Sequence, residues 1–513
     1  MCRDARRTVG ARPLPFEPTP AIRSAARLPD RVSLPDRERT SFPFPCRSAI
    51  VRHMRIGIVS LGCDKNLVDT EYLAGVLESR GHEVVGQGIV DNVDVLVLCT
   101  CGFIESAREE SMAALLAYAD AKKRLGNPRR LVMAGCLAQR WAQEMQAELP
   151  DVDAFAGVGR PETLANLIEE IGKNDSPRPE RAATAAAAIP PPSMRIAHPL
   201  PRKRLDAAPF GYLKIADGCD HACSFCAIPA MKGPYSSVPR EILLDETRAL
   251  IASGVRELNL IAQDVSPYGR DLYKDYALAD LLRDLCRLEG DFRVRVLYFY
   301  PSGLTASFLE VFASEPRICR YLDIPLQHFD PEALRAMRRP QSEAAVADRI
   351  GELRRAVPDV VLRTTLIVGF PGESPKAFQN LLRGVQRMRF EWLGAFAFSP
   401  EEDTPAAAMP NQVDPRAAKR RLDRLMQIQA EITAEIQTQQ IGRVLRVLVE
   451  SVSEDGRQAR GRSYREAPEV DGEIIVRLDG DADHAPRVGE FVEVRITDAD
   501  MYDLIGEPAS PDR

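Results

Sequence analysis

The chain has 513 residues, with 68 Lys and Arg residues against 74 Asp and Glu residues, and therefore a formal net charge of −6. A hydrophobic content of 45% and a charged content of 28% are ordinary for folded domains, and they exclude collagen, a coiled-coil rod and a wholly disordered chain. The length predicts about three domains.

The sequence contains eleven cysteines, and it has no apolar run that approaches the ~18 residues of a membrane span. We also recognise no secretory signal, so we expect no membrane partner and a reducing, cytoplasmic location. In such a compartment, clustered cysteines are more often metal ligands or catalytic groups than disulfides.

Residues 1–53 differ from the rest of the chain. They hold eleven Arg, five acidic residues and eight Pro, and no apolar periodicity runs through them. This composition predicts disorder. Because Met54 opens the first convincing strand, the pattern also indicates a misassigned start, and we expect the segment to be dispensable.

Residues 54–172 alternate between strand and helix patterns, which predicts a parallel α/β sheet built of βαβ units. Strands are expected at 55–60, 93–98 and 130–134, and the first helix is expected at 66–80. A linker follows at 173–204, because this stretch combines an alanine run, three consecutive prolines and several basic residues.

Residues 205–440 repeat the alternation, with helical patterns between six strand candidates. The candidates are 211–216, 257–261, 293–298, 321–324, 360–368 and 392–398. Six units are too few for a complete eight-unit barrel. We therefore expect an open, partial (βα)6 barrel, followed by a long helix near 415–440.

Residues 441–513 change to a period of two, which predicts a small all-β domain with strands at 444–449, 473–478 and 491–496. This domain holds ten Arg and no Lys against seventeen acidic residues, a net charge of −7. We therefore expect an acidic surface that attracts a basic partner. The acids expected to take part include Glu466, Glu469, Asp471 and Glu473.

Cys219, Cys223 and Cys226 form a CxxxCxxC motif just after the first strand of the second α/β series. Thiolates this close in sequence can converge on one cluster, and three ligands leave one iron of a four-iron cube free. The carboxyl end of a strand is also where such folds place their chemistry. The alternative is a zinc site, although zinc usually takes four protein ligands.

Cys63, Cys101 and Cys136 each follow the end of an expected strand in the first domain, and each has a neighbouring glycine. Loops at the carboxyl ends of parallel strands converge, so these three thiolates could hold a second cluster. Taken singly, each cysteine is more often a small buried hydrophobe, but the shared position favours a joint ligand role. Cys99 falls inside a strand and is expected in the core. No ligand role is assigned to Cys2, Cys46, Cys286 and Cys319.

Two three-cysteine sets, an α/β domain, a partial barrel and a small β-domain together resemble the radical methylthiotransferase family. The CxxxCxxC triplet is the signature of the radical S-adenosylmethionine superfamily, and the β-domain corresponds to the TRAM domain of the family. Segments 62–69, 321–328, 363–373 and 461–464 are similar to the RimO branch, which modifies an aspartate of ribosomal small-subunit protein 12. The resemblance covers nearly all of 54–508.

The resemblance implies two [4Fe-4S] clusters and S-adenosylmethionine as cofactors. The CxxxCxxC cluster would supply an electron to S-adenosylmethionine, and the resulting 5′-deoxyadenosyl radical would take a hydrogen atom from the aspartate β-carbon. The cluster of the first domain would hold the sulfur that is methylated and delivered. A second S-adenosylmethionine would provide the methyl group.

Four further residues are candidate cofactor contacts. Phe225 stands between the second and third cysteines, at the aromatic position that packs near the adenine in that family. Gln263 and Asp264 end the next strand, and Gly369 lies in a glycine-rich strand end. The alternative is that Phe225 is a core residue, that Gln263 and Asp264 are ordinary polar loop residues, and that Gly369 is a turn glycine.

The expected partners are ribosomal protein 12, free or in the ribosome, and an electron donor of the flavodoxin or ferredoxin type. A tRNA adenosine methylthiotransferase is the nearest alternative. A domain of net charge −7 should repel a polyanion, however, so tRNA is not expected as a partner. A second alternative is a non-catalytic iron–sulfur or zinc scaffold, which explains the cysteines but not their place at a barrel mouth.

Overall fold

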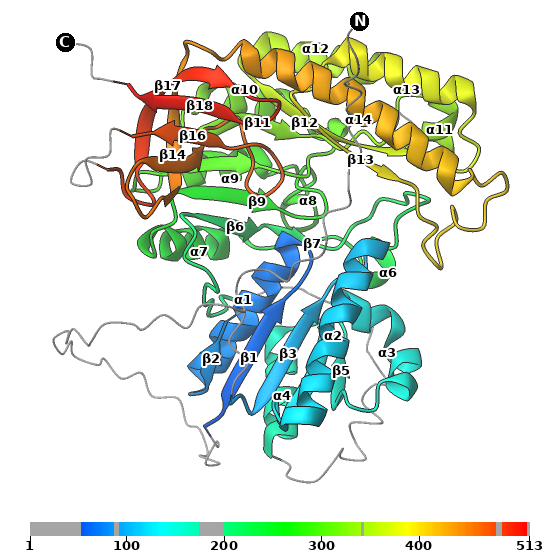
Figure 1. Ribbon diagram of the computed structural model, residues 1–513, viewed down its shortest axis with the longest axis vertical. Helices are drawn as coiled ribbons and strands as arrows, with labels where there is room; N and C mark the ends of the chain where they lie inside the picture. Colours follow the sequence, from blue (N-terminus) through cyan, green and yellow to red (C-terminus); the bar gives the residue numbers. More distant parts are fainter. Residues whose placement is uncertain are drawn as a thin grey trace, which may run out of the picture.

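The computed structural model describes residues 53–86, 92–173, 196, 198–339, 343–478 and 485–509 (Figure 1). The extension expected at 1–53 lies outside these residues except for His53, and most of the linker expected at 173–204 lies outside them as well. The described chain forms two α/β units and one β barrel. The first α/β unit occupies the lower half of Figure 1, below the other two.

The first α/β unit is a five-stranded parallel sheet in the order β2-β1-β3-β4-β5. Its elements are β1 (Arg55–Ser60), α1 (Asp64–Ser79), β2 (Glu83–Val85), β3 (Val95–Thr100), α2 (Glu105–Leu125), β4 (Arg130–Gly135), α3 (Cys136–Glu148), β5 (Ala154–Ala156) and α4 (Pro161–Lys173). One apolar cluster joins the sheet to α1 and α4 through Leu77 and Ile168, and a second joins it to α2 and α3 through Leu115 and Leu137. Because helices cover both faces, β3 is buried along its whole length.

The second α/β unit is a six-stranded parallel sheet in the order β13-β12-β11-β10-β9-β6. Its strands are β6 (Phe210–Lys214), β9 (Glu257–Ile261), β10 (Arg293–Val296), β11 (Ile318–Asp323), β12 (Val361–Val368) and β13 (Trp392–Ala397). Its main helices are α7 (Arg240–Ala252), α9 (Leu278–Cys286), α10 (Ala306–Ser314), α12 (Glu343–Ala356), α13 (Pro375–Met388) and α14 (Pro415–Thr438). Shorter elements are β7 (Ala216–Asp217), α6 (Ile228–Lys232), β8 (Ser236–Ser237), α8 (Arg270–Tyr273), η2 (Pro301–Gly303) and α11 (Pro331–Ala336). The sheet stays open between β6 and β13, which confirms the expected partial barrel.

The third unit is a closed five-stranded barrel in the order β14-β15-β16-β18-β17, as expected for a small all-β domain. Its strands are β14 (Val444–Val452), β15 (Gln458–Arg462), β16 (Ile474–Arg477), β17 (Phe491–Ala499) and β18 (Leu504–Pro508). The sequence patterns missed β15, which is mostly polar, and β18, which is short and contains Gly506. No helix in the described part of the chain is long and apolar enough to cross a membrane.

A buried ion cluster fastens the β barrel to the second α/β unit. Glu257 of β9 is fully buried and pairs with Arg293 and Arg295 of β10. It also pairs with Arg462 of β15, at 2.9 Å. Arg295 also donates to the backbone carbonyl oxygens of residues 463–464. This one cation therefore binds both the carboxylate of Glu257 and the backbone of the β barrel.

Two of the four acids expected at the surface of the β barrel have buried side chains, so the expectation of a free surface for a basic partner is wrong for Glu466 and Asp471. Glu466 is buried and accepts hydrogen bonds from the amide and hydroxyl of Ser463. The side chain of Asp471 is 1% exposed and accepts a hydrogen bond of 2.7 Å from the hydroxyl of Tyr321. The remaining contacts are Glu469 with the hydroxyl of Tyr212, and Glu473 with Arg460.

Candidate active site

Three cysteines lie at the carboxyl ends of neighbouring strands of the first unit. Cys63 caps the start of α1 after β1, Cys101 directly follows β3, and Cys136 begins α3 directly after β4. Since β1, β3 and β4 are adjacent in the sheet, their ends place the three thiols along one edge. Cys99 is buried in the core of the sheet, as expected.

Two glycines let the three cysteine loops pack against one another. A Cβ atom on Gly62 would lie 2.3 Å from the Cβ atom of Cys101 and 3.0 Å from its Sγ. A Cβ atom on Gly102 would lie 2.9 Å from the carbonyl carbon of Cys136. The flanking glycines therefore permit the close backbone approach that the sequence predicted.

Replacing Gly62 with alanine is expected to push the first two cysteine loops apart. The added methyl group collides with Cys101, and Gly62 has a φ of +86° that side chains rarely adopt. We expect iron, measured after anaerobic reconstitution, to fall from about eight to about four atoms per chain. Gly81→Ala is the matched control, because Gly81 has a φ of +88° but no atom within 4 Å. An equal loss of iron in both variants would mean that backbone strain, and not the contact with Cys101, is responsible.

Asn66 links two of the cysteine loops through hydrogen bonds to their backbones. Its Nδ2 atom donates to the carbonyl oxygen of Leu61 at 2.7 Å and to that of Cys99 at 2.9 Å. The first carbonyl precedes Cys63 and the second precedes Cys101, so one side chain sets the spacing of both loops. Sequence reasoning assigned no role to Asn66, because nothing local indicates a partner 33 residues away.

Cys219, Cys223 and Cys226 lie on the loop between β7 and α6. The amide of Cys226 donates to the carbonyl oxygen of Cys223 at 3.2 Å, which folds the second half of the motif into a turn. Ser224 donates through its amide and hydroxyl to the carbonyl oxygens of residues 336–337, at the end of α11. The motif is therefore anchored to the end of the short helix that follows β11.

Gln263 and Asp264 follow β9 at the same mouth. Gln263 donates through Nε2 to Asp217 at 3.0 Å, whereas its buried Oε1 atom has no hydrogen-bond donor among the described residues. The Oδ2 atom of Asp264 lies 2.6 Å from Nε2 of His221, whose ring stacks on Tyr300 at 4.3 Å between centroids. Asp264 therefore holds the CxxxCxxC loop in position through His221. A lone histidine has no sequence pattern that would have singled it out.

Gly369 and Phe225 meet at the carboxyl end of β12. Gly369 has a φ of +73°, and its amide donates to a carboxylate oxygen of Glu373 at 2.5 Å. The ring of Phe225 packs edge-on against Phe370, with centroids 6.5 Å apart, in a small apolar cluster that includes Met337. The fold thus brings the aromatic residue of the CxxxCxxC motif to the glycine-rich strand end.

Cys136 of the first set lies close to the end of the CxxxCxxC motif, where the two α/β units meet. Cys136 shares a small apolar cluster with Ala227 and Met231, and Ala227 directly follows Cys226. Helices α3 and α6 are in contact at this point (Figure 1). The segment that directly follows the CxxxCxxC motif therefore packs against Cys136.

Four charged side chains hold this contact together. Asp69 of α1 pairs with Lys214 of β6 and with Lys232 of α6, and Asp217 of β7 pairs with both lysines. Burial opposes the charges of Asp217 and Lys232, but the lysines lower the pKa of Asp217 to about 2, and Asp217 and Asp69 raise the pKa of Lys232 well above its usual value. Asp217 and Lys232 are therefore both charged at neutral pH. Lys232 also acts electrostatically on Cys136, so this network reaches the first cysteine set.

The chemistry of the donors fits two iron–sulfur clusters. Burial raises the pKa of Cys136 and Cys226 to about 12 and that of Cys219 to about 11, and neighbouring cysteines of each set add to this effect. Cationic iron offsets such a shift and holds the thiols as thiolates. No three His, Cys, Asp or Glu side chains of the described residues converge on a single-ion site. A cluster binds each thiolate through a different iron, so its ligands stand farther apart than those of one ion.

Each of the three units matches the model of a different protein family. Residues 55–157 match the uncharacterized protein family UPF0004, residues 213–384 match the radical SAM superfamily, and residues 441–508 match the TRAM domain. Among solved structures, the radical S-adenosylmethionine methyltransferase TsrM from Kitasatospora setae has a TM-score of 0.51 at 15% identity. The alignment covers 69% of this chain and 77% of that one, and it shows a shared fold.

Curated relatives align over nearly their whole length. The ribosomal protein uS12 methylthiotransferase RimO of Geobacter sulfurreducens is 41% identical over 88% of this chain and 98% of its own. The protein of the same name from Moorella thermoacetica is 43% identical over 88% of this chain and 99% of its own. The chain therefore belongs to the RimO family of methylthiotransferases, within the radical S-adenosylmethionine superfamily.

Proposed function

We propose that this enzyme adds a methylthio group to the β-carbon of an aspartate in ribosomal protein uS12. The named activity of the relatives supports this substrate, and they match the chain across all three units. The observation that carries the proposal is that Cys136, at a strand end of the first unit, packs against Ala227, which directly follows the CxxxCxxC motif. A methylthiotransferase needs one site for radical formation and one for sulfur delivery, and these sites must lie close together.

Cys219, Cys223 and Cys226 are proposed to hold one [4Fe-4S] cluster at the barrel mouth. The other set, Cys63, Cys101 and Cys136, is proposed to hold the second. When bound, these clusters and two molecules of S-adenosylmethionine supply the one-electron chemistry, the sulfur and the methyl group. The chain contributes the geometry, because strand ends of the first unit position one set and the loop between β7 and α6 positions the other.

Residues around the barrel mouth are proposed to orient S-adenosylmethionine. The free Oε1 atom of Gln263 offers an acceptor to a donor group of the cofactor. Asp264 keeps the CxxxCxxC loop in place through His221. Phe225 and the strand end at Gly369 provide the apolar and close-packed side of the pocket, as the resemblance implied.

The proposal also covers the organisation and partners of the chain. We divide it into an extension at 1–53, a first domain at 54–172, a linker at 173–204, a radical domain at 205–440 and a TRAM domain at 441–513. An electron donor of the flavodoxin or ferredoxin type supplies the reducing equivalent, and tRNA is not a substrate. Both the donor and the ribosomal substrate place the enzyme in the cytoplasm.

Mass spectrometry of ribosomal proteins from a deletion strain tests the substrate. We expect uS12 to lose the mass of one methylthio group, and a plasmid copy of the gene should restore it. A strain in which uS12 is unchanged while a tRNA adenosine loses a methylthio group would support the tRNA alternative. If purified enzyme binds zinc in place of iron and cleaves no S-adenosylmethionine, the scaffold alternative holds.

A further inference from the structure

The charged side chains on α13 and on the first ten residues of α14 are almost all positive. α13 contains no acid, and Asp423, the acid in that part of α14, pairs with Lys419 at 3.0 Å. Seven exposed cations lie on these two segments in a chain whose formal net charge is −6. These seven, called the basic face below, are Lys376, Arg383, Arg387, Arg416, Lys419, Arg420 and Arg424. The two helices pack side by side on the outer layer of the second unit (Figure 1).

Helix stability does not account for the basic face. The amino end of a helix is the positive end of its dipole, so cations in the first turn are unfavourable there. Lys376 nevertheless occupies the second position of α13, whose first turn holds no acid and whose cap is the neutral Ser374. Arg416 occupies the second position of α14, where the carboxylate of Asp414 caps the helix. Arg383 hydrogen-bonds the neutral amide of Asn380, so this contact leaves its charge uncompensated.

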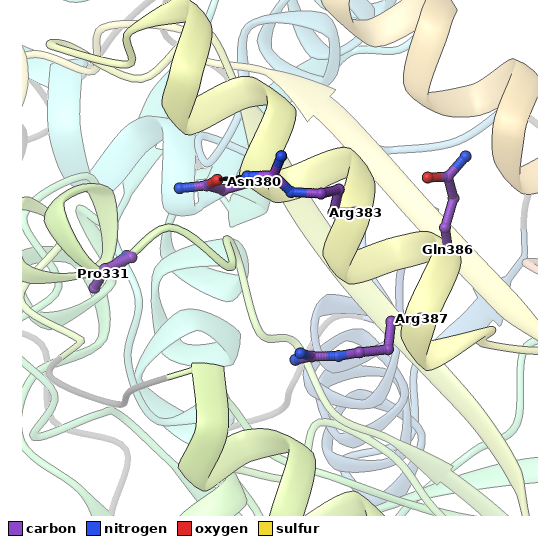
Figure 2. A pocket seen from close by; sticks show the side chains of 5 residues that line it. All are labelled: Pro331, Asn380, Arg383, Gln386 and Arg387. Carbon is purple, nitrogen blue, oxygen red and sulfur yellow. Dashed lines mark hydrogen bonds between the residues drawn. The ribbon is translucent and has the colours of Figure 1, made fainter.

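A cavity of about 720 Å³ opens beside α13, with Pro331 of α11 on its other side (Figure 2). Its lining includes Arg383 and Arg387, one helical turn apart, and the amides of Asn380 and Gln386. None of the lining residues is acidic, although Nδ2 of Asn380 donates to the carboxylate of Asp330 at 2.7 Å. The two guanidinium groups and the amide of Gln386 suit the oxygens of a phosphate group.

The basic face begins next to the barrel mouth. Ala418 of α14 is the nearest neighbour of Gly369, since a Cβ atom on that glycine would lie 2.5 Å from the Cβ atom of Ala418. Arg421, one turn further along α14, donates to the carboxylate of Glu373, which follows the same strand end. A macromolecule bound to the basic face therefore lies alongside the mouth that receives the substrate.

We propose that the basic face binds the sugar–phosphate backbone of small-subunit ribosomal RNA while the neighbouring substrate protein enters the mouth. This inference rests on the proposed function, which places the substrate in a particle built on RNA. The chemistry favours RNA over an acidic protein, because protein interfaces are usually centred on exposed apolar or aromatic anchors. No exposed large hydrophobic side chain of the described residues lies on α13 or on the first half of α14.

The test compares two variants that remove four exposed cations each. The face variant carries Arg383→Gln, Arg387→Gln, Arg420→Gln and Arg424→Gln. The control carries Lys123→Gln, Arg124→Gln, Arg248→Gln and Arg287→Gln, at exposed positions on α2 and α7 and after α9. Binding of labelled, protein-free small-subunit ribosomal RNA to the reconstituted full chains is measured between about 50 and 200 mM salt. Over this range, the release of counterions from the RNA should make the affinity fall measurably as salt is added.

We expect the face variant to bind this RNA at least tenfold more weakly than the wild type, and the control to bind within twofold. The slope of log affinity against log salt should become less steep by about 3 for four lost phosphate contacts. Equal losses in the two variants, or an unchanged salt slope in the face variant, would overturn the proposal. So would loss of binding to a reduced flavodoxin with unchanged binding to RNA.

Activity on isolated uS12 separates this inference from the proposed function. The face variant should methylthiolate the free protein at the wild-type rate, because none of its four positions contacts the cysteine loops or the strand ends. A wild-type enzyme that fails on free uS12 and on intact small subunits contradicts the proposed function. A wild-type enzyme that acts on both with no dependence on the basic face contradicts only the inference about RNA.

Discussion

Replacing Cys223 with alanine is expected to abolish reductive cleavage of S-adenosylmethionine and to lower iron from about eight to about four atoms per chain. The reason is that Cys223 belongs to the motif at the barrel mouth, whereas the other three proposed ligands lie on separate strand ends of the first unit. Cleavage is measured as 5′-deoxyadenosine released under anaerobic reduction. A folded variant that loses all its iron would contradict the assignment of two separate sites.

Replacing Cys101 with alanine should spare radical formation and block sulfur delivery. Cleavage of S-adenosylmethionine should persist, because the barrel mouth is intact, while transfer of the methylthio group to uS12 should fall below detection. Cys99→Ala is the matched control, since Cys99 lies two residues earlier in the same segment but is buried in the core of the sheet. Product formation by the Cys101 variant at the control's rate would remove the first unit from sulfur delivery.

Much of this architecture was predictable because it follows from local patterns. Buried parallel strands read as short apolar runs, as in β3, and their carboxyl ends must meet at one edge of the sheet. That rule was enough to bring Cys63, Cys101 and Cys136 together without any knowledge of the structure. The CxxxCxxC motif needed even less, because its three thiols share one loop.

The contacts between domains were not predictable, because their partners are far apart in the chain. Asp69 meets Lys232 across 163 positions, and each residue alone looks like an ordinary surface charge. The same difficulty explains the error over Glu466 and Asp471, which composition counted as free acids although both side chains are buried. Net charge predicts the character of a domain but not which of its charges face water.

Glu257→Gln is expected to loosen the β barrel from the second unit and to destabilise the protein by about 3–5 kcal/mol. Burial alone would raise the pKa of Glu257, but Arg293, Arg295 and Arg462 hold it well below its usual value. The variant keeps the side-chain shape and leaves three buried or nearly buried guanidinium groups without their shared carboxylate. Chemical unfolding gives the loss of stability, and hydrogen exchange at residues 462–465 reports the loosened contact.

Glu450→Gln provides the control, because Glu450 pairs with Arg462 from the rim of the same contact and its side chain is 25% exposed. Its loss should cost less than about 1 kcal/mol. The sign of the pH dependence gives a second check. The depressed pKa of Glu257 contributes stability above the usual glutamate value of about 4.3, and this contribution is lost as the pH falls through the lower, folded-state value. The difference between wild type and Glu257→Gln should therefore shrink below about pH 4, and a constant difference down to pH 2 would show that packing, and not charge, holds the β barrel in place.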